Sequence, residues 1–237
     1  MYKSGNFLNA KAEVVASWAF TDRNGGNSLP PFDSLNLATH VGDSALAVAF
    51  NREKALTEFG HKDVTWPGPV HGTDVGFVEK SAGLFPDVDA LITRRRGNVL
   101  ATIGADCVPL LACDAENKIV LSAHIGWKGA ANSILENLLD AIKELGGNLT
   151  ETQVLLGPAI CGNCYKVDEA RIKAVAKVLP NAAVDGGVDL RLGLKKALSN
   201  KVKSVEITGA CTFESQNLFS HRRDGVTGRQ AGFVVLK

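Results

Sequence analysis

Short apolar runs, each bounded by glycine, proline or small polar residues, recur along the whole chain and predict more strands than helices. We expect strands at residues 13–20, 75–79, 99–104, 107–112, 119–124, 153–157, 203–208 and 232–236. Longer segments with apolar residues at every third or fourth position predict helices at residues 44–59, 130–145, 167–179 and 189–200. Because strands and helices alternate only in part, the pattern favours an α/β domain with mixed β-sheets flanked by helices.

The first predicted helix, residues 44–59, carries a charged residue within its apolar face and ends before Gly60. The face comprises Ala45, Val48, Ala49, Arg52, Leu56 and Phe59. The long stem of Arg52 can pack along apolar neighbours while its charged head reaches water. The alternative is that Arg52 points inward and binds an anion, and both interpretations stay open.

A long loop, residues 21–36, is the densest cluster of glycine, proline, asparagine and aspartate in the chain. A surface loop is the simpler interpretation. Its length also suits a segment that closes over a site.

Length and charge narrow the class of protein. One domain over residues 1–237 is the expectation for a chain of this size. The formal net charge is +1, so bulk electrostatics gives no reason to expect binding to nucleic acid or to a membrane surface. No apolar run approaches the roughly 18 residues that cross a membrane, and the N-terminus does not read as a signal peptide, so we expect a cytoplasmic protein.

Five cysteines, an odd number, predict reduced thiols rather than a disulfide framework. Two of them, Cys161 and Cys164, form a C-x-x-C motif in a predicted strand-to-helix connection. A second C-x-x-C is missing, so a closed four-cysteine zinc site cannot form. A structural role is favoured, and redox and metal-binding roles stay open.

Three other residues, His71, Cys107 and His124, form a candidate zinc-binding set. Two imidazoles and a thiolate are ligands that zinc prefers, and three protein ligands leave a fourth position for water or substrate. Their spacing matches no compact metal motif, so burial in the core is the alternative. The neighbouring Asp106 stands within an apolar stretch and needs a charged, histidine or backbone partner.

A basic, glycine-rich segment near the C-terminus, residues 221–232, contains His221, Arg222, Arg223 and Arg229. It is either a solvated loop or an anion pocket, because guanidinium groups and backbone amides both bind phosphate. The chain has no P-loop and no G-x-G-x-x-G dinucleotide fingerprint.

Seven stretches follow one family in order and content: FDSLNLATHVGD (32–43), VHGTDV (70–75), DALIT (89–93), GADCVPLLACD (104–114), AHIGWKGA (123–130), LGPAICGNCYKV (156–167) and CTFESQNLFSHRRDGVTGRQA (211–231). Together they resemble the laccase-domain family, first described as multicopper polyphenol oxidases and better described as zinc-dependent purine nucleoside enzymes. The resemblance covers about residues 18–236. It departs from the family pattern at a few positions, such as Lys128 in place of arginine, and none of these is a proposed ligand.

The resemblance implies that His71, Cys107 and His124 hold Zn²⁺, and that Cu²⁺ binds there adventitiously. It implies phosphorolysis of adenosine, inosine and methylthioadenosine, and hydrolytic deamination of adenosine. The expected partners are therefore small-molecule purine nucleosides and phosphate, and no oligomeric state is predicted. The implied fold is a single α/β domain like that of bacterial toxin cysteine hydrolases.

Phosphorolysis needs positive charge around the attacking phosphate, and we expect Asp106 to orient a ligand histidine. The expected catalytic set is Asp106, Lys128, Arg222 and Arg223. The expected substrate-binding set is Asn36, Arg52, Thr73 and Trp127.

Three alternative functions use the same residues. Cys107 is the nucleophile of a cysteine hydrolase if His124 or His71 acts as its base. Copper-dependent phenol oxidation is the second alternative, although a full multicopper centre needs more histidines than the five in this chain. A binding module without catalysis is the third, and the histidines, cysteines and arginines in glycine-flanked turns argue against it.

Overall fold

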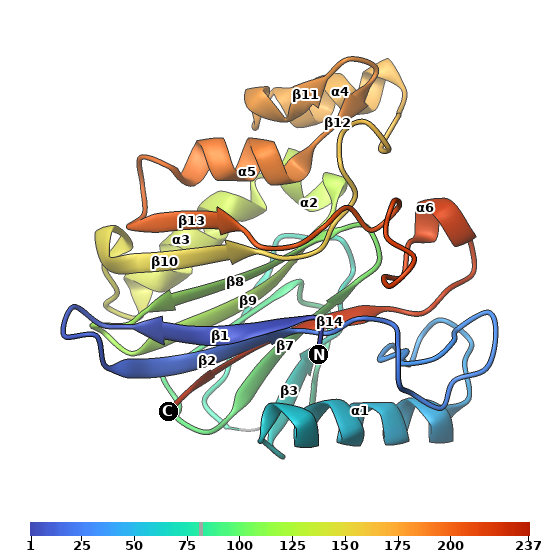
Figure 1. Cartoon of the computed structure of the whole chain (residues 1–237). Coiled ribbons are helices and arrows are strands. Elements are labelled where there is room, and N and C mark those ends of the chain that lie inside the picture. Colours follow the sequence, from blue (N-terminus) through green and yellow to red (C-terminus); the bar gives the residue numbers. More distant parts are fainter. Residues whose placement is uncertain (81–82) are drawn as a thin grey trace.

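Two six-stranded mixed β-sheets lie face to face in the computed structural model, which describes residues 1–80 and 83–237 (Figure 1). The strand order of the first sheet is β1 (Lys3–Leu8), β2 (Val14–Phe20), β14 (Gln230–Leu236), β7 (Val99–Gly104), β3 (Val64–Pro67) and β5 (Gly83–Phe85). The order of the second is β13 (Ser204–Ile207), β10 (Thr152–Leu156), β8 (Val108–Asp114), β9 (Ile119–Ile125), β6 (Ala90–Thr93) and β4 (Val75–Phe77). Parallel and antiparallel pairs occur in both sheets.

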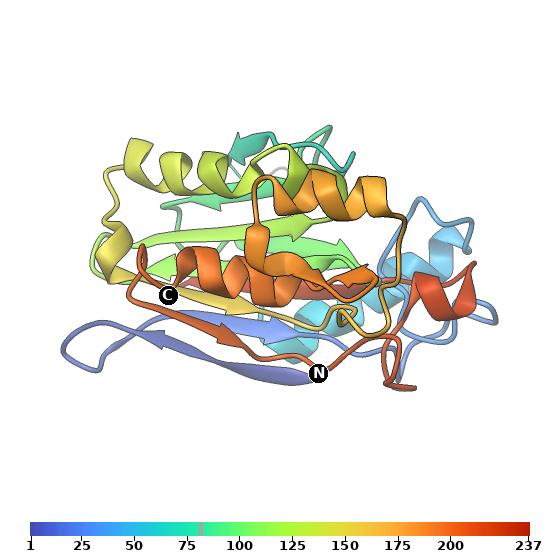
Figure 2. The same cartoon turned by 90° about the horizontal axis from the view of Figure 1, so that it is seen from above.

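Helices cover the outer face of each sheet, which makes four layers. Helix α1 (Ala45–Phe59) packs on the first sheet, and helices α3 (Ile134–Glu144), α4 (Glu169–Ala176) and α5 (Leu190–Leu198) pack on the second. Figure 2 shows the last three from above. The expectation of an α/β domain with mixed sheets is therefore confirmed.

The central strands are buried on both faces, which explains why their sequences are almost continuously apolar. In β7, Val99, Ala101 and Ile103 face α1, whereas Leu100 packs between the sheets. In β8, Leu111 packs between the sheets, and its neighbours Leu110 and Ala112 face the helices of the other side. All eight predicted strands are present, with bounds shifted by at most a few residues.

Helix α1 has the predicted length because both of its ends are capped. The Ser44 side chain accepts a hydrogen bond from the Ala47 amide, and Gly60 adopts the left-handed conformation with φ 81°. Its buried residues are Val48, Asn51, Ala55 and Leu56. The expected apolar face is wrong at Ala45 and Ala49, which are exposed because the buried face runs through Val48, Asn51 and Ala55 instead.

The predicted helix 130–145 is wrong as a single element. The structure has α2 (Trp127–Ala131) followed by α3, and Ser133 between them has φ 66°. This left-handed residue breaks the helix. The break turns the apolar stripe of α3 onto the second sheet.

Several short elements were not predicted, since runs of two to six residues give little periodic signal. They are β1, β3, β5, β6, the 3₁₀ turns η1 (Leu149–Glu151) and η2 (Pro180–Ala182), the hairpin β11 (Ala183–Val184) and β12 (Gly187–Val188), and α6 (His221–Asp224). Helices α4 and α5 are shorter than expected. Among the helices of residues 1–80 and 83–237, none has the length and apolar character needed to cross a membrane.

Several of the connections between the sheets lie at one end of the sandwich. Residues 105–107 join β7 of the first sheet to β8 of the second, and residues 68–74 link β3 with β4. Strand β9 ends nearby and leads into α2, and α6 lies at the same end (Figure 1). Side chains distant in sequence meet there.

Candidate active site

His71, Cys107 and His124 converge at this end of the sandwich. Their ligand atoms lie within 4.8 Å of one another. The two imidazole rings have centroids 4.8 Å apart and meet at 73°. His71 comes from the β3–β4 connection, Cys107 from the β7–β8 connection and His124 from β9. Two nitrogens and one sulfur in this arrangement could hold a metal ion and suit an open zinc site.

Asp89, directly before β6, fixes both histidines and is completely buried. Its carboxylate accepts a hydrogen bond from His124 Nδ1 at 2.8 Å. It also accepts backbone N–H groups from Val70, His71 and Gly72 at 3.1, 3.1 and 2.7 Å. Because Nδ1 of His124 is engaged, Nε2 is left to face the metal position.

Gly126 leaves room for the side chains of His71 and Cys107. A Cβ at Gly126 would lie 2.6 Å from His71 Nδ1 and 3.1 Å from Cys107 Sγ, so only glycine fits there. His71 itself has φ 59°, a conformation rare for residues other than glycine. The Asp89 carboxylate holds this strained turn through the amides on either side of it.

The surroundings of Cys107, His124 and Asp89 shift the pKa of each group in the direction that favours its charged form. Burial opposes ionisation of Cys107, but the charge and hydrogen bonds of His124 and His71 outweigh it and lower the thiol pKa. Burial likewise opposes protonation of His124, but Cys107 and Asp89 raise its pKa. For Asp89, the bonds from His124 and Gly72 overcome burial and lower the pKa. A thiolate, the form that binds metal, is therefore stabilised.

A cavity of about 340 Å³ opens beside the three ligands and is mainly apolar. It reaches His71 and Cys107, and the aromatic rings of Trp127 and Tyr165 form part of its wall. Arg171 lies over the Trp127 ring at 4.5 Å, and Arg222 lies over the Tyr165 ring at 4.8 Å. Further lining residues are Ala105, Asp106, Ile160, Val188, Leu190 and His221.

A second cavity of about 200 Å³ lies against the same ligands and is more polar. His40, which follows the long loop, and Arg229 line it together with His71, Cys107 and His124. Burial and the positive charges of Arg229 and Arg52 lower the pKa of His40. No residue of the predicted loop 21–36 is among the described residues that line the two cavities, so closure of that loop over a site stays a prediction.

The expected role of Asp106 as the partner of a ligand histidine is wrong, because Asp89 has that role. Asp106 lines the larger cavity, and its carboxylate accepts from Thr212 Oγ1 at 2.6 Å, Ser220 Oγ at 2.7 Å and the Arg222 amide at 2.6 Å. Asp106 therefore fastens the start of α6 next to Cys107.

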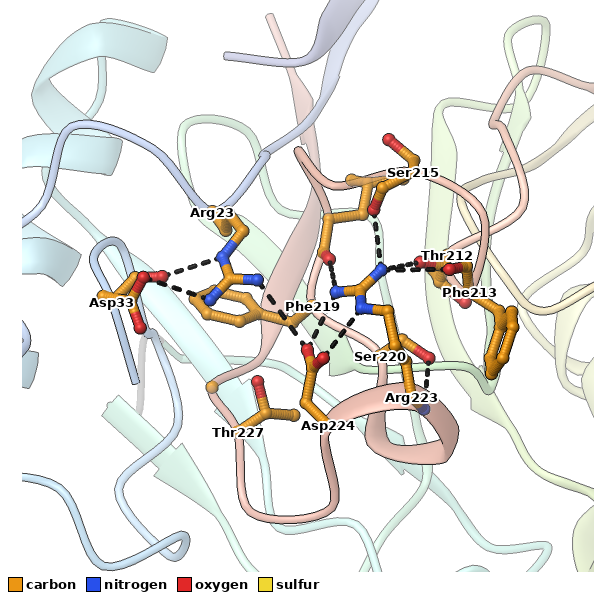
Figure 3. A network of polar contacts seen from close by, with 12 residues as sticks. Arg23, Asp33, Thr212, Phe213, Ser215, Phe219, Ser220, Arg223, Asp224 and Thr227 are labelled. Atoms are coloured by element: carbon orange, nitrogen blue, oxygen red, sulfur yellow. Dashed lines mark hydrogen bonds and ion pairs between the residues drawn. The ribbon is translucent and has the colours of Figure 1, made fainter. Parts of the chain in front are cut away.

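The three cations of the expected catalytic set differ in position. Arg222 lines the larger cavity. Lys128 is exposed, with Nζ 6.0 Å from the centroid of Trp127. The guanidinium of Arg223 donates to Asp224 and to the carbonyls of Thr212, Phe213, Ser215 and Leu218 (Figure 3). All its N–H groups are thus occupied, which corrects the expectation that Arg223 meets phosphate.

Arg52 and Asn36 also have structural contacts. The guanidinium of Arg52 lies 4.0 Å from the Trp66 ring and donates to the Leu37 carbonyl. Burial lowers its pKa to about 10. Asn36 is fully buried. Its side-chain NH2 donates to the Ala38 carbonyl and the Asp43 carboxylate, and its Oδ1 accepts from the backbone amides of Ala38 and Arg229. Its hydrogen-bonding groups are therefore used in holding the long loop to the C-terminal segment.

Thr73 and Trp127, both expected to bind substrate, differ in position. The carbonyl of Thr73 accepts from Asn137 at 3.0 Å, and Thr73 is not among the described residues that line the two cavities. Trp127 lines the larger cavity, as a substrate-binding residue would.

Sequence reasoning missed Asp89, Tyr165 and Arg171. Asp89 stands directly before an apolar run, the same signal that drew attention to Asp106. Arg171 lies on a short helix with many charges and looks solvated in the sequence. No local pattern links it to Trp127.

Comparison with known proteins shows the family. A family model described as multi-copper polyphenol oxidoreductase laccase matches residues 17–237, so the chain belongs to this family. A purine nucleoside phosphorylase of Streptomyces griseus is 40% identical over 93% of this chain and 94% of its own length. One of Mycobacterium tuberculosis strain H37Rv is 39% identical over 92% and 90%, respectively.

Solved structures agree over the whole fold. A Neisseria meningitidis crystal structure matches with a TM-score of 0.86 and 33% identity, over 97% of this chain and 98% of the other. A Geobacillus stearothermophilus crystal structure matches with a TM-score of 0.85 and 31% identity, over 94% and 92%. The implied likeness to toxin cysteine hydrolases is not among these matches.

Replacing Asp89 by asparagine is expected to lower Zn²⁺ affinity by about 10- to 100-fold, because one acceptor oxygen becomes a donor toward backbone N–H groups. Competition with a chromophoric chelator measures the affinity. Asp87→Asn, at an exposed position two residues earlier, is the control. Equal affinity in both variants would show that Asp89 does not position the ligands.

Alkylation of Cys107 by iodoacetamide in metal-free protein is expected to persist well below pH 8.5, the ordinary pKa of a thiol. The lowered Cys107 pKa keeps the thiolate present as the pH falls. Peptide mass spectrometry gives the rate at each pH, and zinc should suppress it. Cys113 is the internal control, since burial and Asp114 raise its pKa. An ordinary thiol profile for Cys107 would contradict the described electrostatics.

Proposed function

We propose that this chain is a zinc-dependent purine nucleoside phosphorylase that acts on adenosine, inosine and methylthioadenosine and also deaminates adenosine. The observation that carries the proposal is the junction of an aromatic cavity, a polar cavity and the set of His71, Cys107 and His124. The relatives named purine nucleoside phosphorylases support the same reaction class.

The larger cavity suits a purine nucleoside. Trp127 and Tyr165 offer flat apolar surface for a base, and Ile160, Val188 and Leu190 complete an apolar wall. The ribose then lies toward the metal ligands, where the two cavities meet at His71 and Cys107.

Positive charge borders the site on two sides. Arg222 lines the larger cavity, and Arg229 lines the smaller one. Lys128 adds charge next to Trp127. In phosphorolysis, a phosphate oxygen bonds to C1′ of the ribose while the glycosidic bond to the base breaks, through an oxocarbenium-like state. These cations hold the phosphate dianion in line with that carbon.

Deamination uses water in place of phosphate. Water adds at C6 of adenosine and ammonia leaves, which yields inosine. Zinc, when held by His71, Cys107 and His124, supplies Lewis acidity and lowers the pKa of water toward neutrality. The protein contributes the orientation of the base through Trp127 and of the ligands through Asp89.

A cysteine hydrolase is the second candidate, favoured by the contact of Cys107 with His124 and by the lowered thiol pKa. The two functions make opposite demands on the metal, because a thiolate that ligates zinc is not free to attack a substrate. The copper-dependent oxidation suggested by the family description is not proposed, because the set offers only two histidines.

Incubation of zinc-loaded protein with adenosine is expected to give adenine and ribose 1-phosphate with phosphate present, and inosine without it. Liquid chromatography separates these products. The zinc-stripped protein and Cys107→Ala should lose both reactions, whereas Cys113→Ala, at a buried thiol outside the set, should retain them. Full activity after zinc removal would favour the hydrolase instead.

Trp127→Ala is expected to raise the KM for adenosine on the order of tenfold, because stacking of a base on an aromatic ring contributes about 1–3 kcal/mol. Steady-state kinetics at saturating phosphate measure the change. Trp127→Phe keeps an aromatic surface and should recover most of the affinity. If the alanine variant kept the original KM, the base would not lie in the larger cavity.

A further inference from the structure

A second cluster of metal-binding groups lies outside the site described above. It consists of Cys161, Cys164, Cys211 and Glu214, and their ligand atoms lie within 4.8 Å of one another. The Sγ atoms of Cys161 and Cys164 are 3.7 and 3.4 Å from Glu214 Oε1. All three cysteines are free thiols.

The backbone brings these residues together from two connections. Cys161 and Cys164 lie on the connection from β10 to α4, and Cys211 and Glu214 lie on the one from β13 to α6. A parallel bridge joins Ala159 to Cys211. The fold therefore supplies the third sulfur that the sequence motif lacks.

Backbone amides hold the sulfurs in place. The Cys161 amide lies 3.3 Å from Cys211 Sγ. The amides of Cys164 and Tyr165 both donate to the Cys161 carbonyl, at 3.1 and 2.9 Å, which closes a tight turn around the C-x-x-C segment. Such a turn presents both thiols to the same point.

The donor set selects the class of cation. Three thiolates and one carboxylate are soft and borderline ligands that suit Zn²⁺ rather than Mg²⁺ or Ca²⁺. Without a cation the thiols of Cys161 and Cys164 donate to the Glu214 carboxylate, and binding of a cation would release their protons. Four protein ligands leave no open position, which is the pattern of structural rather than catalytic zinc.

We propose that Cys161, Cys164, Cys211 and Glu214 form a structural zinc site that joins the β10–α4 and β13–α6 connections. A disulfide between Cys161 and Cys164 is the competing chemistry, and it would use neither Cys211 nor Glu214. The proposal does not depend on the proposed enzyme activity.

The β10–α4 connection is a wall of the larger cavity, and the β13–α6 connection is hydrogen-bonded to a residue of that wall, so the proposed zinc site would act on the candidate active site. Ile160 and Tyr165 flank the C-x-x-C segment and line the cavity. Thr212 follows Cys211 and donates to Asp106, the neighbour of Cys107. Fixing the sulfurs thereby fixes the surface that faces a substrate.

Elemental analysis of untagged protein purified under thiol reductant tests the proposal. The wild type is expected to carry two zinc equivalents per chain. Cys164→Ser should carry one, Cys107→Ser should carry one, and the double variant none. Glu214→Gln should lower the affinity for one of the two zinc ions by roughly tenfold or more, as measured by chelator competition. Controls are Cys113→Ser and Glu53→Gln, which lie outside both sets.

Cobalt substitution gives a readout independent of activity. Co²⁺-loaded Cys107→Ser retains only the three-cysteine set, so it should keep the intense visible bands of tetrahedral thiolate coordination. Its unfolding temperature should fall when Cys164 is also replaced. Buried Cys211 is left unchanged, since its replacement could prevent folding.

Two results would overturn the proposal. One is a wild-type protein with a single zinc equivalent that Cys107→Ser removes and Cys164→Ser does not. The other is a Cys161–Cys164 disulfide in reductant-treated protein that carries zinc only at the histidine set.

Discussion

The carboxylate of Asp89 is the interaction on which the candidate active site depends. One buried carboxylate accepts hydrogen bonds from the ring of His124 and from three consecutive amides around His71, so a strand residue and a loop residue share a single anchor. Each of these hydrogen bonds also stabilises the ionised carboxylate against the cost of burial. The same hydrogen bonds therefore position His71 and His124 and keep the Asp89 carboxylate ionised.

The long strands could be predicted from the sequence because β7, β8 and β9 are apolar over their whole length, and the caps at Ser44 and Gly60 marked α1. The break at Ser133 could not, since a left-handed residue leaves no periodic trace. Similarly, the ligand set could be proposed from residue types and family resemblance. Asp89 could not be paired with His124, because that contact joins residues 35 apart through strand pairing.

The charged residues show why arginine was hard to interpret from sequence. Arg223 and Arg222 are adjacent, yet one is surrounded by carbonyls of its own loop and the other faces a cavity. The difference comes from the turn that begins α6 at Ser220, whose hydroxyl group binds Asp106 and accepts the Arg223 amide. Side-chain direction in such a short element is a property of the tertiary contacts.

Two of the crossings between the sheets carry residues of the His71, Cys107 and His124 set. His71 and Cys107 each lie on a segment that leaves the first sheet and enters the second, while His124 belongs to the second sheet alone. Any sliding of one sheet over the other therefore changes the distances among the three ligands. The apolar core between the sheets, to which Leu111 belongs, therefore helps to keep these three side chains at their distances from one another.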